Sequence, residues 1–253
     1  MSLVAFQGPS RIDGKPVVIL VSGENGNSEN AKTGPMAQTW ILRADIAPHV
    51  AIHTGDDKSV CGDCPLRGLI RKNEDGSTTN HGRSCYVNVR NAPRAVWMAW
   101  KAGKYRIAQS AWKSFKTRLG SYGDPAAVPF KVLVDLIKRG SGKWTGYTHQ
   151  WRQRKFQPLR KLVMASTSSV EETQQAQKMG WRTFRIRKPG EPLMANEFEC
   201  PASTEAGARL DCDRCGACNG IGLKGTRQKA HSVSIVVHGG KGTLGNYNRT
   251  FEV

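Results

Sequence analysis

A run of four cysteines near the C-terminal end constrains this chain more than any other feature of its sequence. The last three cysteines of the run are separated by two residues each, and the full set is Cys200, Cys212, Cys215 and Cys218. Three thiolates at this spacing, joined by a fourth from farther along the chain, are typical of a four-iron cluster. Structural zinc sites usually combine two separate pairs of ligands. We therefore predict a metal centre here, with a [4Fe-4S] cluster favoured and zinc as the alternative.

The remaining three cysteines form a second group in a polar, glycine-bearing segment. They are Cys61, Cys64 and Cys85, with His81 four residues before the last of them. If His81 completes the set, the four ligands suit a tetrahedral zinc ion. If no protein group completes it, a cluster held by three thiolates keeps one iron open for a substrate or a small cofactor. A single centre that draws on both cysteine groups is the third interpretation.

The net charge of the chain is +18, with 38 Lys and Arg against 20 Asp and Glu. Such an excess favours binding to polyanions, so we expect nucleic acid as a partner. One basic cluster, interleaved with Trp151 and Phe156, is the candidate contact surface, and a second cluster spans 182–188. No stretch approaches the roughly 18 apolar residues of a membrane span, so we expect no membrane association. The candidate nucleic-acid residues are Arg152, Arg154, Lys155, Arg160 and Lys161.

Short apolar runs alternate with amphipathic segments along the middle of the chain. We expect strands at 16–22, 38–42, 115–119, 143–148, 159–165, 181–186 and 233–237, and helices at 92–101, 129–138 and 169–179. Strands that alternate with helices indicate parallel pairing through helical crossovers. The predicted fold is α/β, a partial (open) β/α barrel with a metal-organised cysteine insert and a cysteine-rich C-terminal segment. The corresponding divisions are 1–52, 53–90, 91–195 and 196–253.

Polar residues follow the predicted strands, where β/α barrels place their active sites. We take Asp124, Tyr147, His149 and Ser166 as candidate catalytic residues. A turn or helix-cap role is the alternative for Asp124, and a structural, hydrogen-bonded imidazole is the alternative for His149. The loop after the first predicted strand contains the candidate cofactor-binding residues Asn30 and Lys32, although asparagine is also a common turn former.

Several motifs together resemble an uncharacterised, cysteine-bearing family encoded by bacteriophages and mobile elements. They are Asn30-Ala-Lys32-Thr-Gly34, Cys61-x2-Cys64-Pro, Ser84-Cys85-Tyr86, Gly120-Ser-Tyr-Gly-Asp124, Tyr147-Thr148, Ala165-Ser166, Gly180-Trp181-Arg182 and the terminal cysteine run. Members of this family look like distant relatives of radical SAM barrels, in which a cluster with one open iron binds S-adenosylmethionine. The chain lacks the Cys-x3-Cys-x2-Cys spacing of those enzymes.

Taken together, these features predict a phage-encoded iron–sulfur protein that acts on or with nucleic acid. A radical SAM-like enzyme is one alternative, and a nonenzymatic, zinc-stabilised nucleic-acid-binding protein is the other. The sequence begins without the charged and apolar regions of a signal peptide. Because thiolate ligands must stay reduced, we expect the host cytoplasm as the location.

Overall fold

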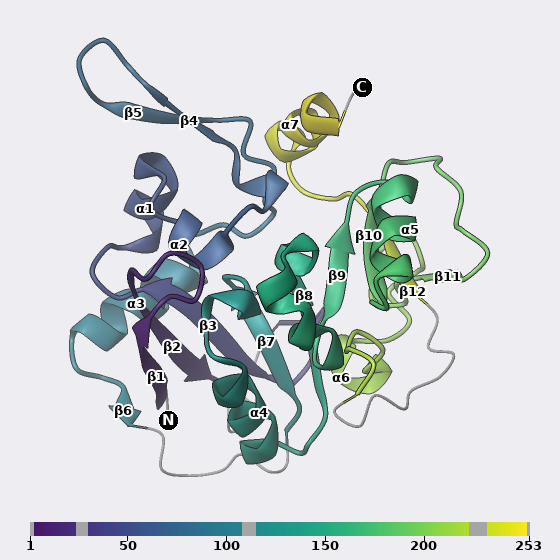
Figure 1. Ribbon diagram of the computed structural model, residues 1–253, viewed down its shortest axis with the longest axis horizontal. Helices are drawn as coiled ribbons and strands as arrows, with labels where there is room; N and C mark the ends of the chain where they lie inside the picture. The colour runs from purple at the N-terminus through teal and green to yellow at the C-terminus, as the bar shows by residue number, and fades with distance from the viewer. Residues whose placement is uncertain (1–2, 24–29, 108–114, 223–231, 252–253) are drawn as a thin grey trace.

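The computed structural model describes residues 3–23, 30–107, 115–222 and 232–251, which form a mixed α/β fold around one large sheet (Figure 1). The sheet has ten strands in the order β11-β12-β10-β9-β8-β7-β3-β2-β1-β6. Pairing is parallel from β3 through to β11, whereas β1, β2 and β3 pair antiparallel. The strands are β1 Leu3–Pro9, β2 Pro16–Ser22, β3 Ala37–Arg43, β6 Arg106–Ile107, β7 Thr117–Tyr122, β8 Trp144–Thr148, β9 Met164–Thr167, β10 Thr183–Arg187, β11 Glu197–Glu199 and β12 Ser232–Val236.

Helices pack along this sheet, with α3 against β3, α4 against β7 and α5 against β10, and a separate two-stranded hairpin lies outside it. Figure 1 shows the hairpin of β4 and β5 extending away from the sheet, with α7 beside its base. The elements outside the large sheet are α1 Pro48–Thr54, α2 Lys58–Cys61, η1 Pro65–Arg67, β4 Leu69–Lys72, β5 Thr78–His81, α3 Ala92–Lys101, η2 Pro125–Ala127, α4 Phe130–Arg139, η3 Gln150–Arg152, η4 Arg154–Lys161, α5 Val170–Lys178, α6 Cys212–Cys215 and α7 Lys241–Phe251.

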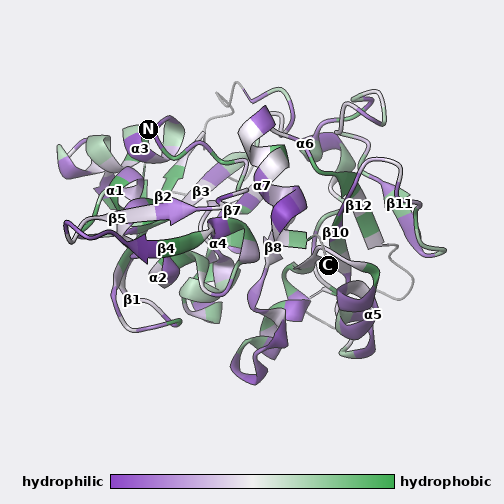
Figure 2. Cartoon of the chain, turned by 90° about the horizontal axis from the view of Figure 1, so that it is seen from above, coloured by the Kyte–Doolittle hydropathy of each residue, from purple (hydrophilic) through white to green (hydrophobic). Residues whose placement is uncertain are grey.

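The apolar sequence runs explain why the central strands form. Val17 to Val21 of β2 are all fully buried, as a strand covered on both faces requires. Figure 2 shows the same contrast across the molecule, with apolar strands inside and a largely hydrophilic β4–β5 hairpin outside. The predicted start of α5 is confirmed, because the Ser169 hydroxyl accepts a hydrogen bond from the backbone N–H of Glu172 at 3.2 Å. The predicted mixed α/β class is confirmed as well.

The strand expected at 159–165 is wrong for residues 159–163. Residues Arg154–Lys161 form the 3-10 helix η4, and β9 begins only at Met164. Phe156, Leu159 and Leu162 are buried at a spacing of three residues, which is the period of a 3-10 helix. Pro158 lies within this segment and has no N–H to donate to a sheet.

No helix in the described part of the chain is long and apolar enough to cross a membrane.

Candidate functional site

A cavity of about 420 Å³ lies at the carboxyl ends of the parallel strands. Its walls include the turn that follows β7, the end of β8, Ser166 of β9, Ile186 of β10 and His238 after β12. Ligand sites in parallel α/β sheets typically occupy this edge, because the loops that follow the strands converge there. All four candidate catalytic residues, Asp124, Tyr147, His149 and Ser166, line this cavity, as do Asn30 and Lys32.

Both cysteine groups reach the same cavity, although more than a hundred residues separate them. The lining residues Cys61, Cys64 and Cys85 come from the insert, and Cys200 and Cys212 come from the C-terminal run. The other two cysteines of that run, Cys215 and Cys218, are close to Cys200 and Cys212. The pKa of the Cys218 thiol shows this proximity, since the charges of the other three affect it. Cys61 is similarly affected by Cys64 and Cys85.

Backbone hydrogen bonds attach the C-terminal cysteines to the strand ends. The N–H of Cys212 donates to the carbonyl of Lys32 at 2.9 Å, and the N–H of Gly146 donates to the carbonyl of Cys218 at 2.8 Å. Asp211 caps α6, its carboxylate accepting from the N–H of Arg214 at 2.7 Å. The run is therefore held between the loop after β2 and strand β8.

The insert is anchored by buried side chains. Val60 and Leu66 are buried, and the backbone N–H of Cys85 donates to the Leu66 carbonyl at 2.9 Å. Cys64 immediately precedes the 3-10 turn η1 and Cys61 ends α2. The predicted partner His81 lies at the exposed end of β5 and is not among the residues that line the cavity. The insert thus places three cysteines at the cavity and its histidine elsewhere.

No group of three or more His, Cys, Asp and Glu side chains in the described ranges is arranged to hold a metal ion. That arrangement concerns ligands that converge on one ion, which for zinc means bonds of about 2.0 to 2.3 Å. A cubane binds each thiolate through a different iron, so its ligands lie farther apart. The four thiols of the C-terminal group are the number that a four-iron cluster uses. The three thiols of the insert would leave one iron of such a cluster without a protein ligand.

Burial raises the pKa of several of these thiols and so favours their protonated form at neutral pH. It raises the pKa of the Cys200 and Cys212 thiols and raises the pKa of Cys218 to about 12. Burial also raises the pKa of Cys61 well above its ordinary value, and neighbouring Asp57 adds to the effect. Because a metal binds the thiolate, any metal that binds here must displace protons, and its affinity must increase with pH.

Hydrogen-bond donors without partners surround the insert cysteines. The Tyr122 hydroxyl, the Ser84 hydroxyl and both terminal nitrogens of Arg83 are buried and have no hydrogen-bond partner in the part of the chain that the structure describes. Arg83 Nη1 has a longer ion-pair contact of 3.7 Å with Asp57. An unpaired buried donor is costly, so these groups are suited to a bound acceptor. The sulfides of an iron–sulfur cluster accept such hydrogen bonds, and the residues therefore fit the group.

Asp124 is held by several donors rather than left free in the cavity. Its carboxylate accepts from the Ala126 N–H at 2.9 Å, from the Thr148 hydroxyl at 2.7 Å and from the His149 N–H at 2.8 Å. These bonds cap η2 and join it to the end of β8. Burial raises the pKa of Asp124 to about 6, although the hydrogen bonds oppose this change. The capping role left open by the sequence is therefore present.

We predict that Asp124 makes folding dependent on pH between about 4 and 6. Its folded-state pKa lies above the ordinary value of 3.8, so the folded protein binds this proton more tightly than the unfolded chain does. The resulting stabilisation is complete below about pH 4 and is lost as pH rises through about 6. Urea unfolding across this range should show the dependence in the wild type and its loss in Asp124→Asn. If the unfolding free energy of the wild type and of Asp124→Asn changed equally with pH, the prediction would be contradicted.

His149 and Ser166 line the cavity, and Ser166 is buried. Burial lowers the pKa of His149 to about 4, so the imidazole is neutral at pH 7. The carbonyl of Ser166 accepts a hydrogen bond from the Trp151 indole at 3.0 Å. Tyr147 packs against Phe184, with ring centroids 4.3 Å apart, and burial raises the pKa of its hydroxyl well above the ordinary value. At pH 7 the His149 imidazole and the Tyr147 hydroxyl are therefore neutral groups that can form hydrogen bonds with a ligand.

The structure adds cavity residues that the sequence interpretation did not select. Arg118 of β7, Tyr86 and His238 all line the cavity. A signal for Arg118 was available, because a charged residue next to buried Leu119 within a parallel strand needs an explanation. Tyr86 lies in an irregular segment after β5 and His238 follows the apolar strand β12, and neither position has such a local signal.

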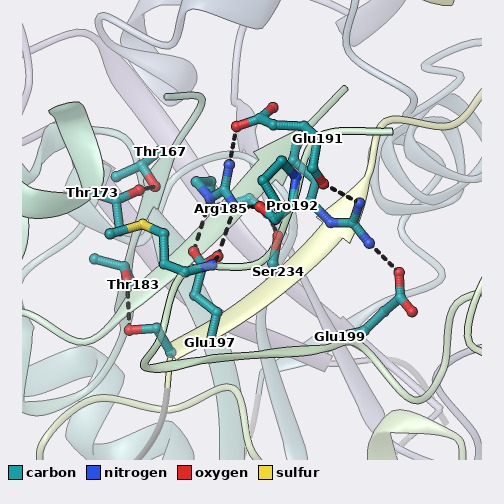
Figure 3. Close-up of polar contacts among 12 residues, drawn as sticks. Thr167, Thr173, Thr183, Arg185, Glu191, Pro192, Glu197, Glu199 and Ser234 are labelled. Carbon is teal, nitrogen blue, oxygen red and sulfur yellow. Dashed lines mark hydrogen bonds and ion pairs between the residues drawn. The ribbon is translucent and has the colours of Figure 1, made fainter. Parts of the chain in front are cut away.

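The second basic cluster, at 182–188, is mostly buried in the fold. Arg182, Arg185 and Arg187 are all buried. Arg185 binds Glu197 through two hydrogen bonds and also contacts Glu191 (Figure 3). Alternation along β10 directs Arg185 and Arg187 into the fold, where carboxylates from 191–199 neutralise both.

The first basic cluster is largely exposed, but its aromatic residues are not. Arg152, Arg154, Lys155 and Lys161 are exposed and Arg160 is half-buried. Trp151 and Phe156 are buried, so they are not available to stack on bases. Arg152 pairs with Glu172 at 2.5 Å, and Lys155 donates to the Arg11 carbonyl at 3.2 Å.

The fold and cavity define a mixed α/β protein with a mostly parallel sheet and a cysteine-lined pocket at its carboxyl edge. Comparisons with protein-family models, with curated proteins and with solved structures found no match. The resemblance to phage-encoded relatives of radical SAM barrels therefore stays a prediction.

Proposed function

We propose that this protein is an iron–sulfur enzyme that acts on nucleic acid, with the cavity as its active site. The observation that carries the proposal is the convergence of two distant cysteine groups on one cavity at the carboxyl edge of the sheet. Cys200, Cys212, Cys215 and Cys218 would hold one four-iron cluster. Cys61, Cys64 and Cys85 would hold a second through three thiolates. The sheet would then be a partial barrel, and host cytoplasm the location.

The residues around the second group suit a cluster that takes part in chemistry. When bound, such a cluster would supply an electron and one open iron position to a chelating cofactor such as S-adenosylmethionine. Arg83, Ser84 and Tyr122 provide the hydrogen-bond donors that lack partners. Tyr147 and neutral His149 are the groups placed to orient a substrate in the cavity. Asp124 acts as a positioning residue, because it binds the His149 backbone.

Metal and acid-labile sulfide analysis of protein purified without oxygen tests this proposal. We expect brown protein with about eight iron atoms and matching sulfide. The variants Cys85→Ser and Cys212→Ser should each lose about half of that iron. Ser77→Ala is the matched control, since it changes an exposed serine of the same insert that does not line the cavity and leaves every thiol in place, and it should keep all the iron.

Two results would decide against this proposal. Colourless protein with zinc and no sulfide would favour the nonenzymatic, zinc-stabilised module, and protein without any metal would exclude both centres. Circular dichroism of each variant separates loss of a ligand from loss of the fold. If iron is present, addition of S-adenosylmethionine should change the spectrum of the wild type and not that of Cys85→Ser.

We predict that the exposed cluster on η3 and η4 contributes to nucleic-acid binding through charge. The side chains of Arg154 and Lys161 are exposed, and neither side chain has a hydrogen-bond or ion-pair partner in the described part of the chain. Changing both to alanine should weaken binding of single-stranded DNA and lower its log–log salt slope by roughly 1.4, because each phosphate contact adds about 0.7. Fluorescence anisotropy at several salt concentrations measures this slope.

The matched control for this prediction removes two charges from a different surface. Arg71 and Lys72 are exposed on β4, in the hairpin that extends away from the sheet (Figure 1). Their double alanine variant has the same net charge as the first variant, so it should leave the slope nearly unchanged. An equal reduction in both variants would show that net charge alone, and not this surface, drives binding.

A further inference from the structure

Two basic side chains face the cavity without a carboxylate partner. Lys32 and Arg118 both line it, and neither has a hydrogen bond or an ion pair with a carboxylate among the residues described. Burial lowers the pKa of Lys32, the nearby thiols Cys200 and Cys212 oppose this change, and the charge of Arg118 adds to it, so the two cations lie near each other and near the C-terminal cysteines. Two cations that repel each other in a partly desolvated space are unfavourable unless an anion lies near both.

Neutral groups hold both cations in place. Lys32 Nζ lies 3.0 Å from Nε2 of His238, while Nδ1 of the same ring lies 3.1 Å from the Val236 carbonyl. An ammonium only donates, so Nε2 accepts and Nδ1 carries the proton, which makes His238 neutral. Arg118 Nη2 donates to the Tyr86 hydroxyl at 3.3 Å. These partners orient the two side chains and leave their positive charges uncompensated.

Buried arginines elsewhere in the fold are treated differently. Arg43 is paired with Asp45 at 2.9 Å and with Asp56 at 3.2 Å. Arg185 is paired with Glu197 at 2.7 Å. Arginines that are buried in the core are thus paired with carboxylates. Lys32 and Arg118 in the cavity differ because they have no carboxylate partner among the residues described.

Aromatic rings line the same cavity. Tyr147 and Phe184 form one contiguous pair on β8 and β10, and Tyr86 packs on His238 with ring centroids 5.4 Å apart. The charge of Arg118 also affects the pKa of Tyr147, so the cations and the rings lie near each other. Flat aromatic surfaces stack on nucleobases, and a volume of about 420 Å³ suits a ligand of nucleotide size.

We infer that the cavity binds a nucleotide unit, with its phosphate at Lys32 and Arg118 and its base against the aromatic wall that includes Tyr147 and Phe184. This inference rests on the proposed function, because it names the substrate class of the same site. The unit is either a free nucleotide or one nucleotide of a strand. Lys32 and Arg118 act as binding residues, and His238 and Tyr86 position them.

Isothermal titration calorimetry of the full chain, purified without oxygen, tests this inference. The probes are the four ribonucleoside 5′-monophosphates, the matching nucleosides and inorganic phosphate. At least one nucleotide should bind about tenfold or more tightly than its nucleoside and than phosphate, since a charged hydrogen bond contributes that much. Lys32→Gln and Arg118→Gln should each weaken it about tenfold or more. Arg71→Gln, on the hairpin, is the matched control and should not.

Iron analysis of the same samples separates this inference from the proposed function. Nucleotide binding without iron would support the inference and remove the proposed enzyme class. Iron without binding of any nucleotide at millimolar concentration would overturn the inference alone. The inference also fails if phosphate binds as tightly as every nucleotide. It fails equally if the two variants lose iron but keep nucleotide affinity, because the cations would then serve to balance cluster charge.

The source of the nucleotide is resolved by a second comparison. A short single-stranded oligonucleotide and the best mononucleotide are titrated into wild-type protein and into Lys32→Arg, which retains the charge. If the oligonucleotide binds more tightly and the mononucleotide competes with it, the ligand is one unit of a strand. If only the mononucleotide binds, the ligand is free in solution. Both results support the site. Lys32→Arg should bind the nucleotide more tightly than Lys32→Gln does, because only the former retains the positive charge. Equal affinities of the two variants would contradict a role for the charge of Lys32.

Discussion

Replacing Arg185 with alanine is expected to destabilise the fold by about 3 to 5 kcal/mol. Its side chain is fully buried, and its Nε and Nη2 bind the two oxygens of Glu197 at 2.9 and 2.7 Å. Glu197 is itself fully buried, so loss of the guanidinium leaves an uncompensated carboxylate in the interior. The pair joins β10 to the start of β11 (Figure 3). Urea unfolding of both proteins measures the difference in unfolding free energy.

Two further variants show whether the buried charge is the cause. Arg152→Ala removes an exposed arginine that also has a glutamate partner, and it should cost less than about 1 kcal/mol. In the double variant Arg185→Met, Glu197→Met, neither charge remains, so most of the lost stability should return. A double variant as unstable as Arg185→Ala would show that packing, and not charge, accounts for the loss.

Replacing Gly123 with alanine is expected to cost about 2 to 5 kcal/mol. Gly123 has a φ of +82°, and an added Cβ would lie 2.4 Å from the carbonyl oxygen of Ile41. The left-handed conformation costs an alanine about 1 to 2 kcal/mol, and a clash with backbone in a packed core adds about 1 to 3 kcal/mol. The substitution also moves Asp124, whose carboxylate holds η2 and the end of β8. Thermal and urea unfolding provide the measurement.

A glycine in open space provides the control. Gly142 has a φ of +74°, and nothing lies within 4 Å of the position of its Cβ. Gly142→Ala therefore keeps the conformational cost of about 1 to 2 kcal/mol and removes the steric one. Equal losses at the two positions would mean that the turn after β7 tolerates movement, and that the packing of Gly123 on Ile41 has little importance.

Local sequence patterns predicted much of the sheet. The strand expected at 16–22 coincides with β2, because five consecutive buried apolar residues suit few other structures. The helix expected at 92–101 is α3, and the helix expected at 129–138 is α4, displaced by one residue. Strand β1, the hairpin and α7 were not predicted, since their residues carry weak periodicity and are stabilised by contacts distant in sequence.

The direction of side chains was less predictable than the elements that carry them. Arg185 and Trp151 were counted toward a binding surface, yet both are fully buried. A basic residue looks the same in the sequence whether it forms an ion pair with a buried carboxylate or is exposed to water. Glu197, which decides the matter for Arg185, lies on another strand.

The sequence by itself determined the α/β class, the central strands and the polar residues at their ends, because these follow from local periodicity and turn chemistry. It also determined the composition of the two cysteine groups. Only the tertiary structure decided that Cys85 and Cys212 line one cavity, that His81 lies outside it and that Lys32 faces Arg118. Those relations depend on which strands are neighbours in the sheet, and strand order is set by the burial of the whole chain rather than by any one segment.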